Sequence, residues 1–306
     1  LDVKMKEEIT VGFGGNVSSH QANQLYLGLG YQYLGRFAAD VNSNFQVGNS
    51  FSGVMLSGRM YLQTQIPTYL NWQGVFSDKK YTESQSLFYE DIVPAMIKQK
   101  ELYMKLKLGF PFLNHAKAEI GFAYGRLNDF YLQSTTIPFP NASFDHSWYD
   151  LFSGSLSIEQ NSLNTKQYPI SGKQQFLIAQ YVTGTEKYTP SPTSATTEAP
   201  IGRKVHSWLQ LKGRWNQYQT LSNRFNLGYL AEMVISSKNL MNNYTASVLQ
   251  APAFTPTPHS EIVFNEAFRA NQYVAFGLSP ILKLSKLLHF RLDMYGFAPL
   301  LSLIHI

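Results

Sequence analysis

Hydrophobic and polar side chains alternate along most of this chain, most clearly in the stretch 101–125. In its first half, alternate positions are apolar: Leu102, Met104, Leu106 and Leu108. The positions between them include three charged residues: Glu101, Lys105 and Lys107. After a short break the alternation resumes, with Phe122 on the apolar side and Lys117 and Glu119 on the charged side. Because successive side chains of an extended chain point to opposite faces, the stretch predicts a β-hairpin with one uncharged and one charged face.

The same alternation recurs in thirteen segments, most of them about 10 to 16 residues long. Strands of soluble proteins have a mode of about 5–6 residues, whereas a tilted strand needs about 9–11 residues to cross the hydrocarbon core of a bilayer. Strand length therefore favours a membrane protein. The predicted strands are 8–16, 21–33, 36–48, 51–63, 68–78, 98–111, 115–128, 147–160, 173–187, 203–219, 222–237, 270–284 and 288–299.

The connections between these segments are of two kinds. The joins after the second, fourth, sixth, tenth and twelfth segments are short, whereas four others are long and irregular: 79–97, 129–146, 188–202 and 238–269. Short turns on one side and long loops on the other are typical of outer-membrane barrels, whose short turns are periplasmic. We therefore predict an all-β fold, a transmembrane antiparallel β-barrel in the bacterial outer membrane, with its first strand rising from the periplasm.

Thirteen strands do not close a bacterial single-chain barrel, which has an even strand number. An open edge in lipid would leave backbone groups unpaired. We therefore expect an incomplete barrel domain over residues 1–300, truncated at both ends, and a non-native tail at 301–306.

Several stretches resemble the C-terminal barrel of the patatin-like phospholipases of Bacteroidetes-type bacteria, which in turn is similar to the BamA-like superfamily of outer-membrane assembly and secretion barrels. The order and spacing of these stretches carry the resemblance, which extends to about residue 300. They are Gly-Leu-Gly-Tyr-Gln-Tyr-Leu-Gly-Arg at 28–36, Gly-Phe-Pro at 109–111, Asn-Ser-Leu-Asn-Thr-Lys-Gln-Tyr-Pro-Ile-Ser-Gly at 161–172, Ala-Pro-Ala-Phe-Thr-Pro at 251–256 and Phe-Arg-Ala-Asn-Gln-Tyr-Val-Ala-Phe-Gly-Leu at 268–278.

The resemblance implies sixteen strands, of which about thirteen are present here, and a longest loop between strands eleven and twelve. The longest predicted loop, 238–269, falls at that place. In the superfamily this loop enters the lumen and carries an arginine in a Val-Arg-Gly-Phe/Tyr motif. Arg269 is the nearest counterpart, but its context is Phe-Arg-Ala and the glycine is missing. The implied function is to anchor an upstream patatin-like lipid acyl hydrolase domain, with the barrel assembly machinery as a partner. Translocation of that domain is a second, weaker implication.

Catalysis by this chain itself is not expected. The patatin nucleophile elbow, Gly-x-Ser-x-Gly, does not occur in the 306 residues. There is no cysteine and no His/Asp/Glu cluster with metal-ligand spacing, so we expect no catalytic residue, cofactor or metal. The net charge of +5 comes from Lys and Arg spread along the strands, which does not favour nucleic-acid binding.

Side-chain parity then assigns residues to the two faces of the wall. We expect outer-membrane lipids to cover Leu102, Met104, Leu106, Leu108 and Phe122. We expect the lumen to be lined by Asp40, Arg59, Glu101, Lys105, Lys107, Lys117, Glu119, Lys212, Arg214, Glu232, Arg291 and Asp293. Two alternatives remain open: a stand-alone outer-membrane pore or transporter without a passenger enzyme, and a soluble all-β carbohydrate-binding sandwich whose apolar faces pack on each other.

Overall fold

A computed structural model describes residues 8–16, 24–48, 51–82, 96–113, 115–132, 143–192, 202–257, 259–261, 264–285 and 288–301. Nearly all of the regular structure is extended, as the alternating sequence predicts. The first seven strands are β1 (Ile9–Asn16), β2 (Gln24–Leu34), β3 (Ala38–Gly48), β4 (Phe51–Leu62), β5 (Thr68–Thr82), β6 (Met96–Phe112) and β7 (Ala116–Tyr131). They are followed by β8 (Asp145–Asn161), β9 (Gly172–Thr189), β10 (Gly202–Thr220), β11 (Phe225–Ser236), β12 (Gln272–Lys283), β13 (His289–Arg291) and β14 (Met294–Leu301).

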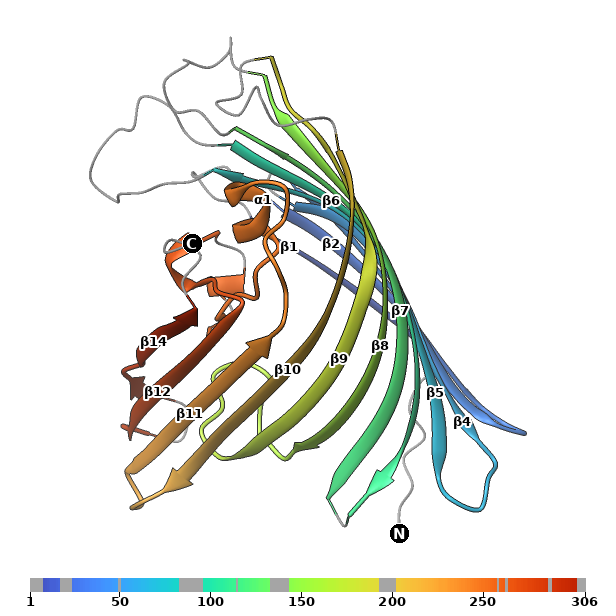
Figure 1. Cartoon of the computed structure of the whole chain (residues 1–306). Helices are drawn as coiled ribbons and strands as arrows, with labels where there is room; N and C mark the ends of the chain where they lie inside the picture. The colour runs from blue at the N-terminus through green and yellow to red at the C-terminus, as the bar shows by residue number, and fades with distance from the viewer. Residues whose placement is uncertain are drawn as a thin grey trace. The chain divides into compact units, whose positions relative to one another are not determined.

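The strands form one sheet in which chain order is also spatial order, from β1 to β13, with β14 pairing β12 (Figure 1). Neighbouring strands pair in antiparallel register, for example Gln73↔Lys105 between β5 and β6. Short joins connect adjacent strands that run in opposite directions. Strands joined by long connections, such as β5 and β6 or β11 and β12, also pair antiparallel with their chain neighbours. The predicted all-β antiparallel arrangement is therefore confirmed over the part of the chain that the structure describes.

The last predicted strand, 288–299, is divided into β13 and β14, which keep the same register against β12 across the break. The register shifts only further along, between Gln272 and Tyr273 of β12. Ile281 faces Arg291 and Leu278 faces Met294, so no residue is gained or lost between the two pieces. The interruption lies opposite Pro280, which has no backbone N–H to donate, although its carbonyl still accepts from the Leu292 amide at 3.1 Å. The fourteen strands thus correspond to the thirteen predicted ones, with one ladder broken by a proline. The expected tail at 301–306 lies outside the described residues except for Leu301, the last residue of β14.

By its internal contacts the chain divides into two compact units. The first comprises Leu1–Phe110, Ile120–Gly154 and Thr183–Val205, and the second Pro111–Glu119, Ser155–Val182 and His206–Ile306. In the second unit the connection from β11 to β12 carries the helix α1 (Tyr244–Leu249) and the short 3-10 helices η1 (His259–Glu261) and η2 (Glu266–Phe268). Asn243 caps α1 by accepting a hydrogen bond from the Ala246 amide. Of the helices described, none is long and apolar enough to cross a membrane.

The two faces of the sheet differ as the alternation predicts. In β7, Glu119 is buried while Ile120 and Phe122 are exposed, and in β11, Glu232 is buried while Met233 is exposed. We call the face that carries Glu119 and Glu232 the polar face, and the opposite one the apolar face. The side chains that a soluble protein would bury are therefore those left exposed here.

Candidate functional site

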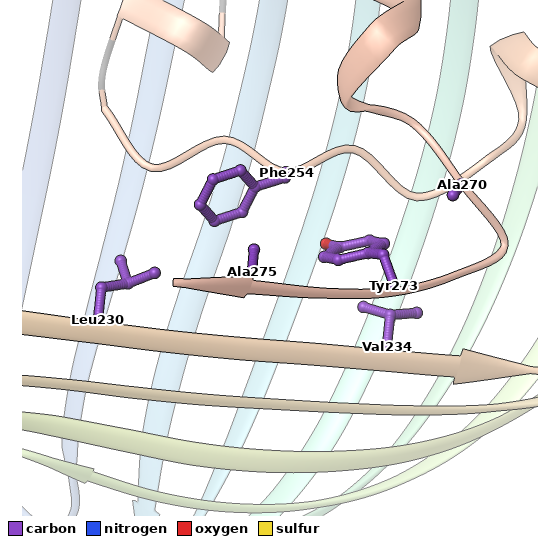
Figure 2. Close-up of a cluster of buried hydrophobic side chains, with 6 residues drawn as sticks. All are labelled: Leu230, Val234, Phe254, Ala270, Tyr273 and Ala275. Carbon is purple, nitrogen blue, oxygen red and sulfur yellow. The ribbon is translucent and has the colours of Figure 1, made fainter. Parts of the chain in front are cut away.

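The connection between β11 and β12 folds onto the polar face of these two strands. Leu230 and Val234 of β11 and Tyr273 and Ala275 of β12 point toward this segment, and Phe254 packs on them (Figure 2). Ala270 completes the cluster, and the half-buried Tyr295 and Phe297 of β14 pack against it. Burying this apolar area fixes the segment on the sheet. The polar face of β11 and β12 is therefore covered in part by a small hydrophobic core.

A buried carboxylate lies next to this core. The side chain of Glu232 is inaccessible to solvent, and its Oε1 atom lies 3.1 Å from Lys212 Nζ. Its Oε2 atom accepts a hydrogen bond from Arg214 Nε. The Tyr273 hydroxyl donates to Oε1 at 2.5 Å. Two cations and a phenol compensate the cost of burying one carboxylate. Of the predicted polar-face residues, Lys212, Arg214 and Glu232 are thus brought together in one site.

Arg269 stabilises the conformation of the β11–β12 connection. Its Nη1 atom donates to the carbonyl oxygens of Leu249 at 2.9 Å and Ala251 at 3.3 Å, at the end of α1. The guanidinium lies 4.7 Å from the centre of the Phe264 ring. Arg269 and Ala253 also pair as an isolated β-bridge. These contacts lie within the segment itself, so this arginine organises the segment that covers the sheet.

A second arginine, Arg291 of β13, joins distant parts of the second unit. Its Nη1 atom donates to the Pro169 carbonyl at 2.9 Å and its Nη2 atom to the Tyr218 hydroxyl at 2.9 Å. Its Nε atom donates to Asp293 at 2.7 Å, so the predicted residues Arg291 and Asp293 form an ion pair. Asn226 donates to the neighbouring Ile170 carbonyl at 2.6 Å. The connection between β8 and β9 is therefore tied to β10, β11 and β13.

A polar cavity of about 270 Å³ lies between this connection and the β11–β12 segment. Its charged lining residues are Lys166, Arg214, Glu261, Arg291 and Asp293. Arg214 and Arg291 are already engaged with Glu232 and Asp293, respectively. The cavity therefore belongs to the charge network of this unit. Among the residues described, no three His, Asp or Glu side chains gather so as to hold a metal ion.

Replacing Arg291 should loosen the β8–β9 connection without unfolding the sheet. Arg291→Gln removes charge-assisted hydrogen bonds, each contributing about 1.5–3 kcal/mol. We expect backbone amides in 163–171 to exchange hydrogen about tenfold faster or more, measured by mass spectrometry on the chain folded in detergent micelles. Arg36→Gln, at an exposed turn, is the matched control. Unchanged exchange in Arg291→Gln would contradict the tethering role.

Other charged residues of the second unit form a further ion-pair cluster. Lys117 lies 3.0 Å from Glu159 and 3.5 Å from Glu119, joining β7 to β8. Glu119 is buried, whereas Lys117 and Glu159 are about one-third exposed. Partly exposed pairs of this kind contribute little, about 1 kcal/mol or less. The sequence did not identify Glu159 as a partner of Lys117, because strand register had to be known first.

In the first unit the predicted polar-face residues are half-buried. Asp40 and Arg59 face each other across β3 and β4, and the Arg59 guanidinium lies 4.8 Å from the centre of the Tyr69 ring. Glu101 pairs with Lys79 at 3.5 Å. Lys105 and Lys107 face Gln73 and Asn71 of β5. These contacts are spread along the strands and do not converge on a single site.

On the apolar face, the residues expected to meet lipid are accessible. Met104, Leu106, Leu108 and Phe122 are exposed, and Leu102 is half-buried. Their accessibility agrees with the parity assignment, whereas contact with lipid stays a prediction.

The sequence analysis did not identify the tyrosine hydroxyls that complete the polar sites. Tyr273 donates to Glu232 of the paired strand β11, and Tyr218 of β10 accepts from Arg291 of β13, so only the folded sheet brings these pairs together.

Neither the family models nor the curated proteins contain a match to this chain. Among solved structures, the crystal structure of BamA from Haemophilus ducreyi lacking POTRA domains 1–3 matches over 97% of this chain, with a TM-score of 0.65. The chain has a BamA-like β-barrel fold. The identity is 12%, so the similarity concerns the fold alone, and the match spans 59% of the BamA chain. The predicted fold class is confirmed, and the resemblance to patatin-like phospholipases finds no support in this match.

Proposed function

We propose that this chain is an integral β-barrel of the bacterial outer membrane that anchors an upstream domain on the periplasmic side. The observation that carries the proposal is the apolar face of a sheet with the BamA-like fold. Large apolar side chains are exposed there from the first strand to the last, such as Phe13 (88%), Phe122 (66%) and Phe276 (61%). Soluble monomers rarely expose so extended an apolar surface. Lipid is the partner that would cover it.

The anchoring role rests on chain geometry and on the sequence resemblance. Short joins follow even-numbered strands such as β2, β4 and β6, so β1 starts on the short-turn side, which is periplasmic in outer-membrane barrels. Residues upstream of β1 would therefore lie in the periplasm. That the attached domain is a patatin-like lipid acyl hydrolase is supported by the motifs of 28–36, 161–172 and 268–278. Insertion by the barrel assembly machinery belongs to the same proposal.

Fractionation and protease protection test the proposal on the full-length gene product with an epitope tag upstream of β1. We expect the protein in the outer-membrane fraction, and the tag resistant to protease in intact cells but digested once the outer membrane is permeabilised. A soluble protein would overturn the membrane assignment. A signal peptide directly upstream of the barrel would instead favour the stand-alone pore, and a tag digested on intact cells would favour translocation.

A further inference from the structure

An open groove crosses the apolar face of the first unit, with a volume of about 540 Å³. It runs over the neighbouring strands β4 to β8. Its side-chain walls are mainly apolar and aromatic: Leu56, Trp72, Met104, Leu106, Phe122 and Phe152. A groove of this composition fits a hydrocarbon chain.

The floor of the groove is a glycine. Gly74 of β5 faces Leu56 on one neighbouring strand and Met104 on the other. A Cβ atom at this position would meet nothing within 4 Å, whereas one at Gly58 would collide with the Trp72 ring at 2.6 Å. Close packing therefore requires a glycine at position 58. It does not require one at position 74, where glycine weakens the strand interior. The missing side chain at Gly74 leaves space between large neighbours.

A polar cluster lies at one end of this groove. Tyr124, which lines the groove, donates its hydroxyl hydrogen to Asp150 at 2.8 Å. Arg126, two residues further on the same face of β7, donates to Asp150 through Nε at 2.8 Å. The Trp148 indole donates to the same carboxylate at 3.2 Å, and the Arg126 guanidinium lies 5.2 Å from the centre of its ring. Asp150 thus orients the Tyr124 phenol, the Trp148 indole and the Arg126 guanidinium beside the apolar groove.

Arg126 keeps donors for a further acceptor. Its contact with Asp150 uses Nε, and its side chain is 43% exposed. A guanidinium offers five N–H donors in a planar fork that matches phosphate, and such charge-assisted bonds are among the strongest. Tyr and Trp are enriched at membrane–water interfaces, where one end of the side chain is apolar and the other polar. The cluster therefore has the composition of a lipid headgroup site.

We propose that the groove and Arg126 together bind one phosphate-bearing acyl lipid of the surrounding membrane. An acyl chain lies over Gly74 between Leu56 and Met104, and the lipid phosphate accepts hydrogen bonds from Arg126. This inference rests on the proposed outer-membrane location. Beyond Arg126, β7 leads to the long connection between β7 and β8. The lipid thus belongs to the leaflet on the side of the long connections.

Lipid binding to the full chain, folded in neutral detergent and followed by native mass spectrometry, tests this site. The two probes are phosphatidic acid and diacylglycerol with identical acyl chains, which differ only in the phosphate. We expect phosphatidic acid to bind about tenfold more tightly, as a charge-assisted hydrogen bond implies. Arg126→Gln should abolish this preference, and Arg126→Lys should keep part of it. Gly74→Leu, which fills the groove, should weaken both lipids about tenfold.

Two matched controls should leave binding unchanged. Gly154→Leu fills another open glycine position, on β8 outside the groove lining, and Arg36→Gln removes an exposed arginine at a turn. Heat-modifiable migration verifies that every variant is folded. If the folded wild-type chain in detergent shows no phosphate preference, or if inorganic phosphate alone displaces the lipid, the site is overturned while the membrane assignment stands. A chain that does not partition into membranes would overturn the proposed function and the site with it.

Discussion

Replacing Glu232 by leucine should destabilise the chain by about 3 kcal/mol, the lower end of the range for breaking a buried ion pair. Glu232 is the counter-charge of both Lys212 and Arg214, whose side chains are only 25% and 19% exposed. Glu232→Leu would leave two largely buried cations without their carboxylate counter-charge. The Tyr273 hydroxyl would also lose its acceptor on Glu232. Urea unfolding of the chain in detergent micelles, followed by tryptophan fluorescence, measures the free energy of unfolding.

A triple variant separates loss of charge balance from loss of packing. Lys212→Met, Arg214→Met and Glu232→Leu together remove the whole ion cluster at similar volume, and we expect much of the stability to return. Glu159→Leu is the matched single control, because Glu159 and its partner Lys117 are both partly exposed, and it should cost less than about 1 kcal/mol. Equal losses in Glu232→Leu and Glu159→Leu would contradict the buried-cluster interpretation.

Alternation alone is sufficient to predict most of the strands and the direction of most of their side chains. At Glu119 and Phe122, for example, side-chain parity predicts the observed exposure, because an extended chain fixes the direction of every second residue. The break between β13 and β14 was not predicted. It depends on Pro280 in the partner strand, which is invisible to periodicity within 288–299.

The covered part of the polar face was also beyond the pattern. Leu230 and Val234 lie on the same face as Glu232, an apparent exception to the apolar–polar alternation of β11. The exception arises because Phe254 of the following connection packs on them. Likewise, the sequence singled out Arg269 in the long loop, whereas Arg291 contacts residues distant in the sequence, Pro169 and Tyr218. Such contacts depend on folding of the connections, which strand periodicity does not encode.

The assignment of the apolar face to lipid yields a comparison between adjacent residues. Leu106→Arg should block assembly into the outer membrane, whereas Lys105→Leu should be tolerated. Leu106 is 47% exposed on the apolar face of β6, where an arginine at the bilayer midplane costs about 2–4 kcal/mol. Lys105 is half-buried on the opposite face and faces Gln73 of β5, so leucine there adds no charge to the lipid-facing surface.

Heat-modifiable migration of outer-membrane fractions on a gel reports whether each variant has folded. We expect the compact, heat-sensitive band for wild type and Lys105→Leu, and its loss for Leu106→Arg. In a soluble sandwich the apolar faces would pack on each other, and Leu106→Arg would disrupt a protein core without any dependence on a bilayer. Refolding of Leu106→Arg into bilayers of different thickness adds a second criterion.

The free-energy cost of an arginine side chain falls toward the membrane interface. Thinner bilayers should therefore partly restore folding of Leu106→Arg if position 106 faces lipid. They should not restore it if position 106 is buried in a protein core. Equal behaviour of Leu106→Arg and Lys105→Leu would exclude lipid contact for this face.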